Sequence, residues 1–443
     1  MIMRKVNIKY ATSLFTVLMF TMFIINGCND KTEEEYIEYN IEQRENEVKE
    51  LLGENWQETV PYMTMTFTGG GLILGGSGMV IINWGDGAPN THVTLSGGIY
   101  GEVFRHNYLK DTRHTITVIG DNTTYLNRSG LTSLDVSKNP ALEKLECING
   151  WLSSLDLGRN PALTYLDAKN NNISNLDLSN NRELKFLAVY QNELKSLDLS
   201  NNVALTRLEC GYNNPLSNID LSNNIALEYL DITNFPQDFK AKWGKLDVSN
   251  NPALKILYCS NQGLSELNLS NNLALTTLDC SLNYITNLDL SNNRALLGLA
   301  CDSNRLTSLN LSNNSVLTGL HCSSNRLLSL DLSNNTALSW LTCDSNSLAN
   351  LDLSNNTVLN ILSCNSNKLT SLDLSNNSKL GSLYCTNNNF QADALNALFR
   401  SLSIVKYGCI RIANNPGITG AGFNQSIAEK KGWKFEYPPY SLC

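Results

Sequence analysis

The sequence predicts a β-rich solenoid, in which a small β-sandwich precedes a long array of short repeats and an α/β cap follows it. Twelve segments of the form L-x-x-L-D-L-S-x-N, with occasional replacements, occur between residues 131 and 377. A second segment, L-x-x-L-x-C-x-x-N, stands between successive copies, as in "LSWLTCDSN" at 338–346. Seven of its cysteines recur every 21 residues. A short repeat of fixed length indicates stacked, nearly identical coils.

The N-terminus resembles a lipoprotein signal. Arg4, Lys5 and Lys9 precede an apolar stretch at 11–25, which is typical of a secretory signal peptide. At 15 residues the stretch is shorter than the roughly 20 that a membrane span needs, and an uncleaved anchor helix is the alternative. The following "INGC" resembles a bacterial lipobox. The resemblance implies that residues 1–27 are removed and that Cys28 is lipidated.

An acidic segment follows the lipobox. "CNDKTEEEY" at 28–36 resembles the stretch that sends Bacteroidetes lipoproteins to the outside of the outer membrane, although a solvated linker would look similar. We therefore expect residues 28–58 to form an acidic tether with a helix, on a surface-exposed lipoprotein of the outer membrane. Loss of residues 1–27 removes three basic residues and changes the net charge from −8 to −11. Nucleic acid is not an expected partner, because its phosphates require a basic surface.

Residues 59–128 have the pattern of a small β-domain. Short alternating runs separated by glycines, such as "MVIINWGDG" at 79–87, predict antiparallel strands and hairpins. "WGDG" at 84–87 and "HNY" at 106–108 resemble the polycystic-kidney-disease type of β-sandwich. This resemblance implies a spacer or an interaction module.

The repeat that follows resembles a known family. Its length and its leucine and asparagine spacing are those of leucine-rich repeats. The nested halves of 10 and 11 residues, with cysteine in one half, resemble the repeats of bacterial internalins over about residues 131–390. We expect a leucine-rich-repeat solenoid of about 12 coils at 129–390. The resemblance implies adhesion to host or neighbouring-cell surfaces.

The register of the repeat predicts a ladder of free cysteines. Alternate residues of a strand point to one side, so positions four and six of each half are expected to face the interior. Cysteine stands at position six, where Ala168, Val189 and Ile232 replace it in three repeats, so we expect it to act as a small buried apolar side chain. Disulfides are the default outside the cytoplasm, but coils about 4.8 Å apart hold the Cβ atoms beyond the roughly 3.8 Å that a disulfide requires. A single file of thiols also disfavours a metal or redox site. The predicted ladder comprises Cys147, Cys210, Cys259, Cys280, Cys301, Cys322, Cys343, Cys364 and Cys385.

Two further segments depart from the repeat. About six extra residues fall within 234–245, either as a tolerated bulge or as an aromatic loop beside the binding surface. Residues 391–443 contain two predicted helices and a strand, and we expect them to cap the open end of the core. Cys409 and Cys443 lie outside the ladder, and the sequence leaves a bond between them open.

The sequence contains no recognisable catalytic constellation. Its four histidines are scattered, and the glycine-rich stretch at 69–78 lacks the spacing of a nucleotide-binding loop. The aspartates of the "LDLS" half could suggest calcium, but Asn268 and Asn310 replace two of them and the usual ligand loops are absent. We expect these aspartates to accept hydrogen bonds from backbone amides. The chain is therefore expected to be a binding protein without a cofactor, and not an enzyme.

One outward face of the repeat varies and the other does not. The "LDLS" half presents Ser, Asp and Ser almost throughout, whereas positions three, five and seven of the cysteine half vary strongly. Aromatic and charged residues, which are enriched at binding hot spots, gather in its first five coils, although drift on an unused surface would also produce variation. The predicted ligand-binding face comprises Lys144, Glu146, Tyr165, Asp167, Lys169, Phe186, Tyr190, Arg207, Glu209, Tyr229 and Asp231. We expect it to bind a protein or glycan on a host or neighbouring cell. A glycan-binding accessory of a nutrient-uptake system is the alternative.

Overall fold

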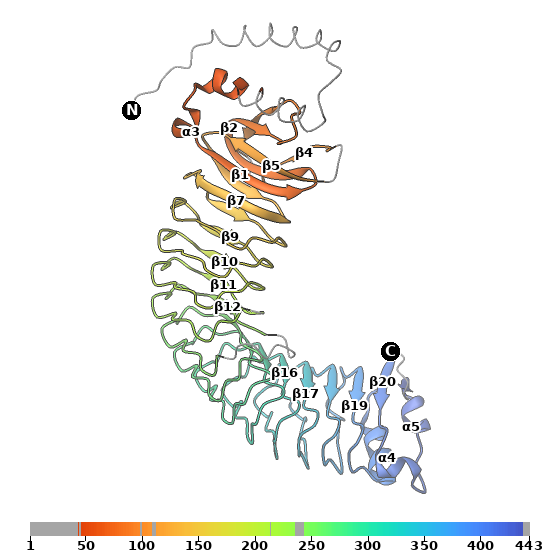
Figure 1. Ribbon diagram of the computed structural model, residues 1–443. Coiled ribbons are helices and arrows are strands. Elements are labelled where there is room, and N and C mark those ends of the chain that lie inside the picture. The colour runs from red at the N-terminus through yellow and green to blue at the C-terminus, as the bar shows by residue number, and fades with distance from the viewer. Residues whose placement is uncertain are drawn as a thin grey trace.

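The computed structural model describes residues 43, 46–97, 100–108, 112–212, 214–234 and 243–436. They form a curved solenoid with a small β-domain at its N-terminal end and two helices at its C-terminal end (Figure 1). The expected signal peptide, Cys28 and most of the acidic tether lie outside the described residues. No helix among the described residues has the length and apolar character needed to span a bilayer.

The β-domain is built from two sheets that share one long strand. Its elements are α3 (Trp56–Thr59), β1 (Tyr62–Thr68), β2 (Gly71–Asn83), β3 (Thr91–Ser96), β4 (Glu102–Arg105), β5 (Arg113–Ile119), β6 (Thr123–Asn127) and β7 (Leu131–Lys138). The first part of β2 pairs with β4 and β6, and its second part pairs with β3 and β5. At the bend, Gly76 has φ 132°, and a Cβ there would lie 1.9 Å from the carbonyl oxygen of Asn122. Glycine is needed at this position because no L side chain fits.

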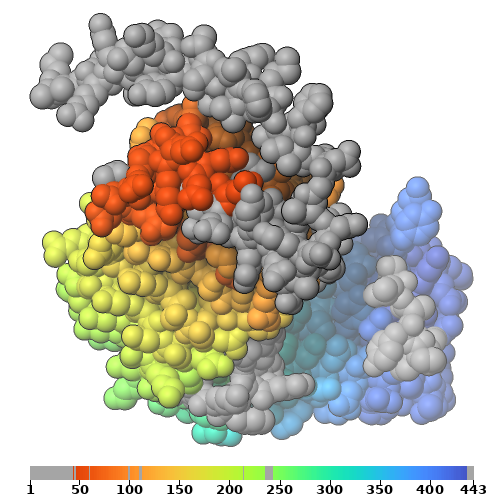
Figure 2. All heavy atoms as spheres, turned by 45° about the horizontal axis from the view of Figure 1, so that its top comes forward, coloured from red at the N-terminus to blue at the C-terminus, as the bar shows by residue number. Residues whose placement is uncertain are grey.

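The β-domain continues directly into the solenoid. Strand β6 pairs in parallel with β8, so one sheet of the domain becomes the sheet of the coils. The space-filling view shows the domain packed closely against the first coils (Figure 2). The first "LDLS" segment forms β7, which pairs antiparallel with β1 of the β-domain. The two parts therefore share backbone hydrogen bonds and not only side-chain contacts.

Twelve three-residue strands form the parallel sheet of the coils, each paired in register with the next. They are β8 (Lys144–Glu146), β9 (Tyr165–Asp167), β10 (Phe186–Ala188), β11 (Arg207–Glu209), β12 (Tyr229–Asp231), β13 (Ile256–Tyr258), β14 (Thr277–Asp279), β15 (Gly298–Ala300), β16 (Gly319–His321), β17 (Trp340–Thr342), β18 (Ile361–Ser363) and β19 (Ser382–Tyr384). They lie on the concave side of the curve (Figure 1). The predicted solenoid fold is confirmed.

The expectation of a strand in both halves of the coil is wrong for the "LDLS" half after β7. That half forms extended segments and turns without a sheet ladder. Its side chains nevertheless alternate as expected, because Leu155 and Leu157 are buried while Asp156 between them is exposed. Alternation follows from extended backbone alone, whereas a ladder also requires neighbouring backbones in register.

A single apolar core runs the length of the array. The leucines at positions one, four and six are buried in every complete coil. All nine cysteines of the predicted ladder are buried with an exposed fraction of 1% or less, and all are free thiols. Burial raises the pKa of each of these thiols. The thiols therefore stay neutral and pack as apolar groups.

Two columns of buried asparagines close the bends. In the cysteine half, Asn304 Nδ2 donates to three carbonyl oxygens, including that of Cys280 at 2.9 Å. Its Oδ1 accepts the N–H of Ile285 at 3.0 Å. In the "LDLS" half, Asn293 Nδ2 donates to the carbonyls of Leu269 and Asn272. These bonds supply partners for backbone groups that no strand satisfies.

The C-terminal end of the core is covered by elements of different character. They are α4 (Ala392–Ser401), β20 (Gly408–Arg411), η2 (Pro416–Thr419), α5 (Ser426–Glu429) and β21 (Trp433–Phe435). Strands β20 and β21 extend the parallel sheet, while Phe399 of α4 and Trp433 of β21 are buried in the cap. Cys409 is disulfide-bonded, and Cys443 lies outside the described residues. Most of the insertion at 234–245 also lies outside the described residues. Trp243, near the end of the insertion, is buried with an exposed fraction of 8%.

Candidate functional site

The varied residues that the sequence singled out lie on the concave sheet. Positions three and five of the cysteine half are the first and last residues of each strand, and register pairing sets them in straight rows across the coils. Position seven follows just after each strand. All the predicted face residues belong to coils β8–β12, so this face begins next to the β-domain (Figure 1).

Position three carries a row of aromatic and cationic side chains in face-to-face contact. The Lys144 ammonium lies 4.7 Å from the ring centroid of Tyr165, whose ring stacks on Phe186 at 4.1 Å with only 3° between the planes. The Arg207 guanidinium lies 5.7 Å from the Phe186 centroid and 3.7 Å from that of Tyr229. Each ring or cation thus covers the next, over five consecutive strands. Such contacts contribute about 0.5–1.5 kcal/mol each beyond area burial.

The row begins one strand earlier than the sequence predicted. Tyr125 of β6 is in register with Lys144, and the Lys144 ammonium lies 4.5 Å from its ring centroid. We call the resulting set the stacked row: Tyr125, Lys144, Tyr165, Phe186, Arg207 and Tyr229. Sequence reasoning missed Tyr125 because it lies in the β-domain, outside any repeat. No local sequence signal indicated that the two sheets join.

Position five carries a row of carboxylates. Three of them form ion pairs within their own coils: Glu146 with Lys144 at 2.8 Å, Asp167 with Lys169 at 3.0 Å, and Glu209 with Arg207 at 2.6 Å. We call Glu146, Asp167, Glu209, Asp231 and Asp279 the carboxylate row. Asp279 of β14 was outside the predicted face. Ala188 and Tyr258 interrupt the row.

The aromatic residues of the predicted ligand-binding face fall into two rows. Tyr190 stands at position seven, where its ring meets that of Tyr212 edge-on at 5.7 Å and the Lys169 ammonium lies 5.5 Å from its centroid. Tyr258 meets Tyr229 edge-on at 5.8 Å. Tyr212 and Tyr258 were not in the predicted set. Tyr258 stands at position five of the coil just after the insertion, beyond the five coils of the predicted face.

Partial burial perturbs the ionisable groups of this face. Burial raises the pKa of the Asp231 carboxyl, and the nearby charges of Glu209 and Asp279 raise it further, against a hydrogen bond from the Thr233 N–H. Burial also raises the pKa of the Asp167 carboxyl, although Lys169 opposes the change. Burial and the Asp231 carboxylate together raise the pKa of Tyr229 to about 12. The Asp167 and Asp231 carboxylates of this face are therefore poorly solvated.

Comparison with solved structures shows the family. The functional domain of InlJ from Listeria monocytogenes, which includes a cysteine ladder, is 32% identical, with a TM-score of 0.56 over 66% of this chain and 69% of that chain. The chain belongs to the internalin-like leucine-rich-repeat proteins. Two other structures share the fold. Internalin InlF from Listeria monocytogenes is 21% identical over 68% of this chain and 85% of that chain, with a TM-score of 0.52. A leucine-rich-repeat protein of Leptospira interrogans is 17% identical over 70% and 93%, with a TM-score of 0.54. No family model and no curated protein matches the chain.

The second half of this internalin-like array presents a plainer concave face. Position three holds Gly298 and Gly319, where an added Cβ would meet open space. Trp340 is next in the row and is 45% exposed, with the His321 ring tilted against it at 5.3 Å. Aromatic side chains therefore gather in the first half, and Trp340 and Tyr384, whose ring lies 5.0 Å from the Arg411 guanidinium, stand apart from them.

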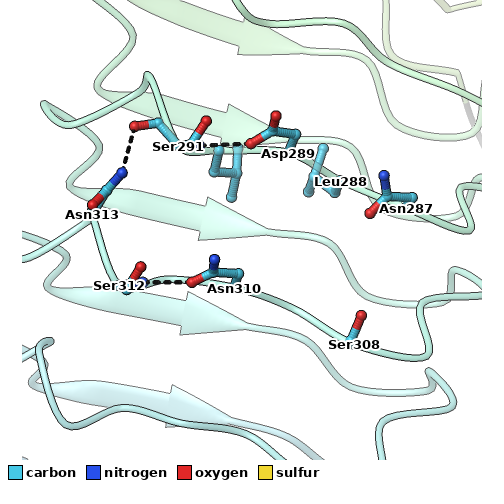
Figure 3. A pocket seen from close by; sticks show the side chains of 9 residues that line it. Asn287, Leu288, Asp289, Ser291, Ser308, Asn310, Ser312 and Asn313 are labelled. Atoms are coloured by element: carbon cyan, nitrogen blue, oxygen red, sulfur yellow. Dashed lines mark hydrogen bonds between the residues drawn. The ribbon is translucent and has the colours of Figure 1, made fainter.

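The uniform half of the internalin-like coil uses its polar groups internally. Figure 3 shows a small depression between two coils, where Asp289 Oδ1 accepts the N–H of Ser291 at 2.9 Å and Asn310 Oδ1 accepts that of Ser312 at 3.0 Å. Asn313 Nδ2 donates to the Ser291 carbonyl at 3.0 Å. No cluster of metal-ligating side chains occurs within the described ranges. The aspartates accept backbone N–H groups as the sequence analysis expected, and Asn310 does so equally well.

Proposed function

We propose that this chain is a surface-attached binding protein, and that the concave sheet from β8 to β12 contacts its partner. The stacked row is the observation that supports the proposal. A row of adjoining aromatic and cationic side chains resembles the residue composition of binding hot spots, and it is confined to one end of the concave face. The membership in the internalin-like family is consistent with a binding role.

The geometry of the row suits recognition. Tyr125 is buried and the other side chains are half-buried, and they hold one another in place, so little side-chain freedom is lost when a partner binds. Strands about 4.8 Å apart give the six residues of the row a length of about 24 Å, enough for an extended chain of several residues. The uniform half of the coil has no comparable set of side chains.

Truncation of the aromatic side chains tests the proposal. A partner is first isolated by screening the purified chain against cell-surface proteins and defined glycans. Its affinity for the Phe186→Ala/Tyr190→Ala variant is then measured by calorimetry. We expect a loss of at least about 2 kcal/mol, or roughly 30-fold, as for hot-spot residues. Trp340→Ala is the matched control on the other half of the same face. Equal weakening by the control would place the site elsewhere.

We further propose attachment through a lipid on Cys28, at the outside of the outer membrane. The proposal is supported by the lipobox-like "INGC" and by the acidic segment after it. Cells fed a labelled fatty acid should label the wild-type chain and not Cys28→Ser. Equal labelling of both would contradict the anchor without affecting the binding proposal.

A further inference from the structure

This inference rests on the proposed function and names the chemistry of the partner. We propose that the concave site takes a protein segment that carries basic side chains, and that Asp231 and Asp279 receive those side chains on either side of Tyr258. Two independent observations support this: both faces of Tyr165 and of Phe186 are already covered, and the carboxylates outnumber the cations.

The covered ring faces argue against a glycan. A pyranose ring binds an aromatic side chain by laying its C–H groups on a free ring face. In the stacked row, Tyr165 has Lys144 on one side and Phe186 on the other, and Phe186 has Tyr165 and Arg207. For these two rings, only the edges and the Tyr165 hydroxyl remain for a partner. Backbone carbonyls, hydroxyls and side-chain edges of a protein segment match these groups.

The charge balance indicates basic side chains in the partner. The face has five carboxylates in the carboxylate row and three cations, Lys144, Lys169 and Arg207, each paired with a carboxylate within 3.0 Å. Asp231 and Asp279 make no ion pair among the described residues. Each uses Oδ1 to accept one backbone N–H at 2.9 Å, from Thr233 and Ser281 respectively. A cation from a partner can therefore pair with either carboxylate.

Tyr258 completes the place for a cation. Register pairing sets it between the two carboxylates, with Asp231 in the strand before it and Asp279 in the strand after it. Its ring meets Tyr229 edge-on at 82°, so this contact covers at most one face of the Tyr258 ring. A lysine or arginine side chain on either side of Tyr258 can lie against its ring and donate to the carboxylate on that side. Burial, which raises the pKa of the Asp231 carboxyl, makes a neutralising partner more favourable there.

The test compares two panels of probes on the purified full-length chain. One panel holds short synthetic peptides of equal length and aromatic content that range from acidic to basic, and the other holds defined glycans. We expect basic peptides to bind, with an affinity that falls as salt is added. Asp231→Asn/Asp279→Asn should weaken that binding about tenfold or more, since two charge-assisted contacts are lost. Both asparagines keep the backbone acceptor, so the variant should fold.

Asp331→Asn/Asp352→Asn is the matched control. It removes the same charge from the uniform half, where Asn268 and Asn310 already accept the same backbone bond. It should leave peptide binding unchanged. Binding of glycans alone, or equal peptide binding by Asp231→Asn/Asp279→Asn and the wild type, would overturn the inference. In either case, Phe186→Ala/Tyr190→Ala distinguishes the inference from the proposed function. If this variant loses the bound probe, the proposed function still stands. If it binds the probe as the wild type does, the proposed function fails together with the inference.

Discussion

Asparagine at position nine makes different hydrogen bonds in the two halves of a coil. Asn304, in the cysteine half, uses both ends of its amide, because Oδ1 accepts the N–H of Ile285 while Nδ2 donates to three carbonyls. Asn293, in the "LDLS" half, uses Nδ2 alone within the described structure, and its buried Oδ1 has no partner there. The two residues look interchangeable in the sequence, yet only one leaves a buried N–H without a partner when it is removed.

We therefore expect Asn304→Ala to destabilise the solenoid more than Asn293→Ala. A net hydrogen bond contributes about 1 kcal/mol, and an unpaired buried N–H costs about 1–3 kcal/mol, so the difference should be at least about 1 kcal/mol. Denaturant unfolding of the two variants measures it. Equal losses would show that the Ile285 N–H finds another partner or that the Oδ1 bond contributes little.

Asp231 should make stability depend on pH. Its pKa is raised in the folded chain above the ordinary 3.8, so the folded state holds the proton more tightly and loses stability as pH rises through the raised pKa. At neutral pH, Asp231→Asn should be more stable than the wild type, by about 1 kcal/mol or less, because it keeps the Thr233 bond without the buried charge. The advantage should shrink as pH falls toward 3.8, where the wild type becomes neutral. Denaturant unfolding of both proteins at several pH values measures the difference. If the wild type is more stable than Asp231→Asn at neutral pH, the Asp231 charge does not destabilise the fold and the prediction is wrong.

At the scale of the element, the column of thiols behaves as part of the core. Every ladder cysteine takes a place that leucine takes in the other half of the coil, and burial excludes both water and reagents. The wider spacing of parallel coils keeps neighbouring thiols from closing a bond. The column is then ordinary apolar packing, because Ala168, Val189 and Ile232 are buried at the same position in other coils.

Cys301 tests this account of the column. Its thiol should resist alkylation in native buffer and react after unfolding, since burial raises its pKa well above the usual 9.0. Cys301→Val should cost under about 1.5 kcal/mol as an apolar swap of similar volume. A Cys280–Cys301 or Cys322–Cys343 disulfide in the native protein, detected by mass spectrometry, would contradict it.

The sequence predicts single elements of this fold better than the way they join. Position and direction of Leu257 or Cys280 follow from a repeat that obeys the geometry of extended backbone, so the inward and outward sets could be predicted. The absence of a strand in the "LDLS" half could not be predicted, because hydrogen-bond register depends on how neighbouring coils lie against each other. The same holds for the site. Rows on the concave face were predictable, whereas the entry of Tyr125 into the stacked row depends on the β6–β8 pairing between two different folds.

The whole molecule is a curved solenoid whose concave sheet carries the stacked row at one end, next to the β-domain. Backbone hydrogen bonds hold the strands about 4.8 Å apart, while the turns of the other half are bulkier, so the array bends toward its strands (Figure 1). Bending brings the side chains of adjacent strands together and produces the face-to-face contacts of the stacked row. The β-domain extends that row by one strand and covers the end of the core. Its position makes it part of the proposed site and not only a spacer.

The location of the site on the concave sheet is the central claim, and hydroxyl-radical footprinting with and without bound partner tests it most directly. Aromatic side chains are the reactive probes, and the chain presents them in separate places. The account predicts that the partner protects Tyr165, Phe186 and Tyr229 from oxidation. Trp340 on the other half of the sheet and Tyr407 in the cap, which are 45% and 71% exposed, should react as before. Protection of Trp340 or Tyr407 with the stacked row unchanged would contradict the account.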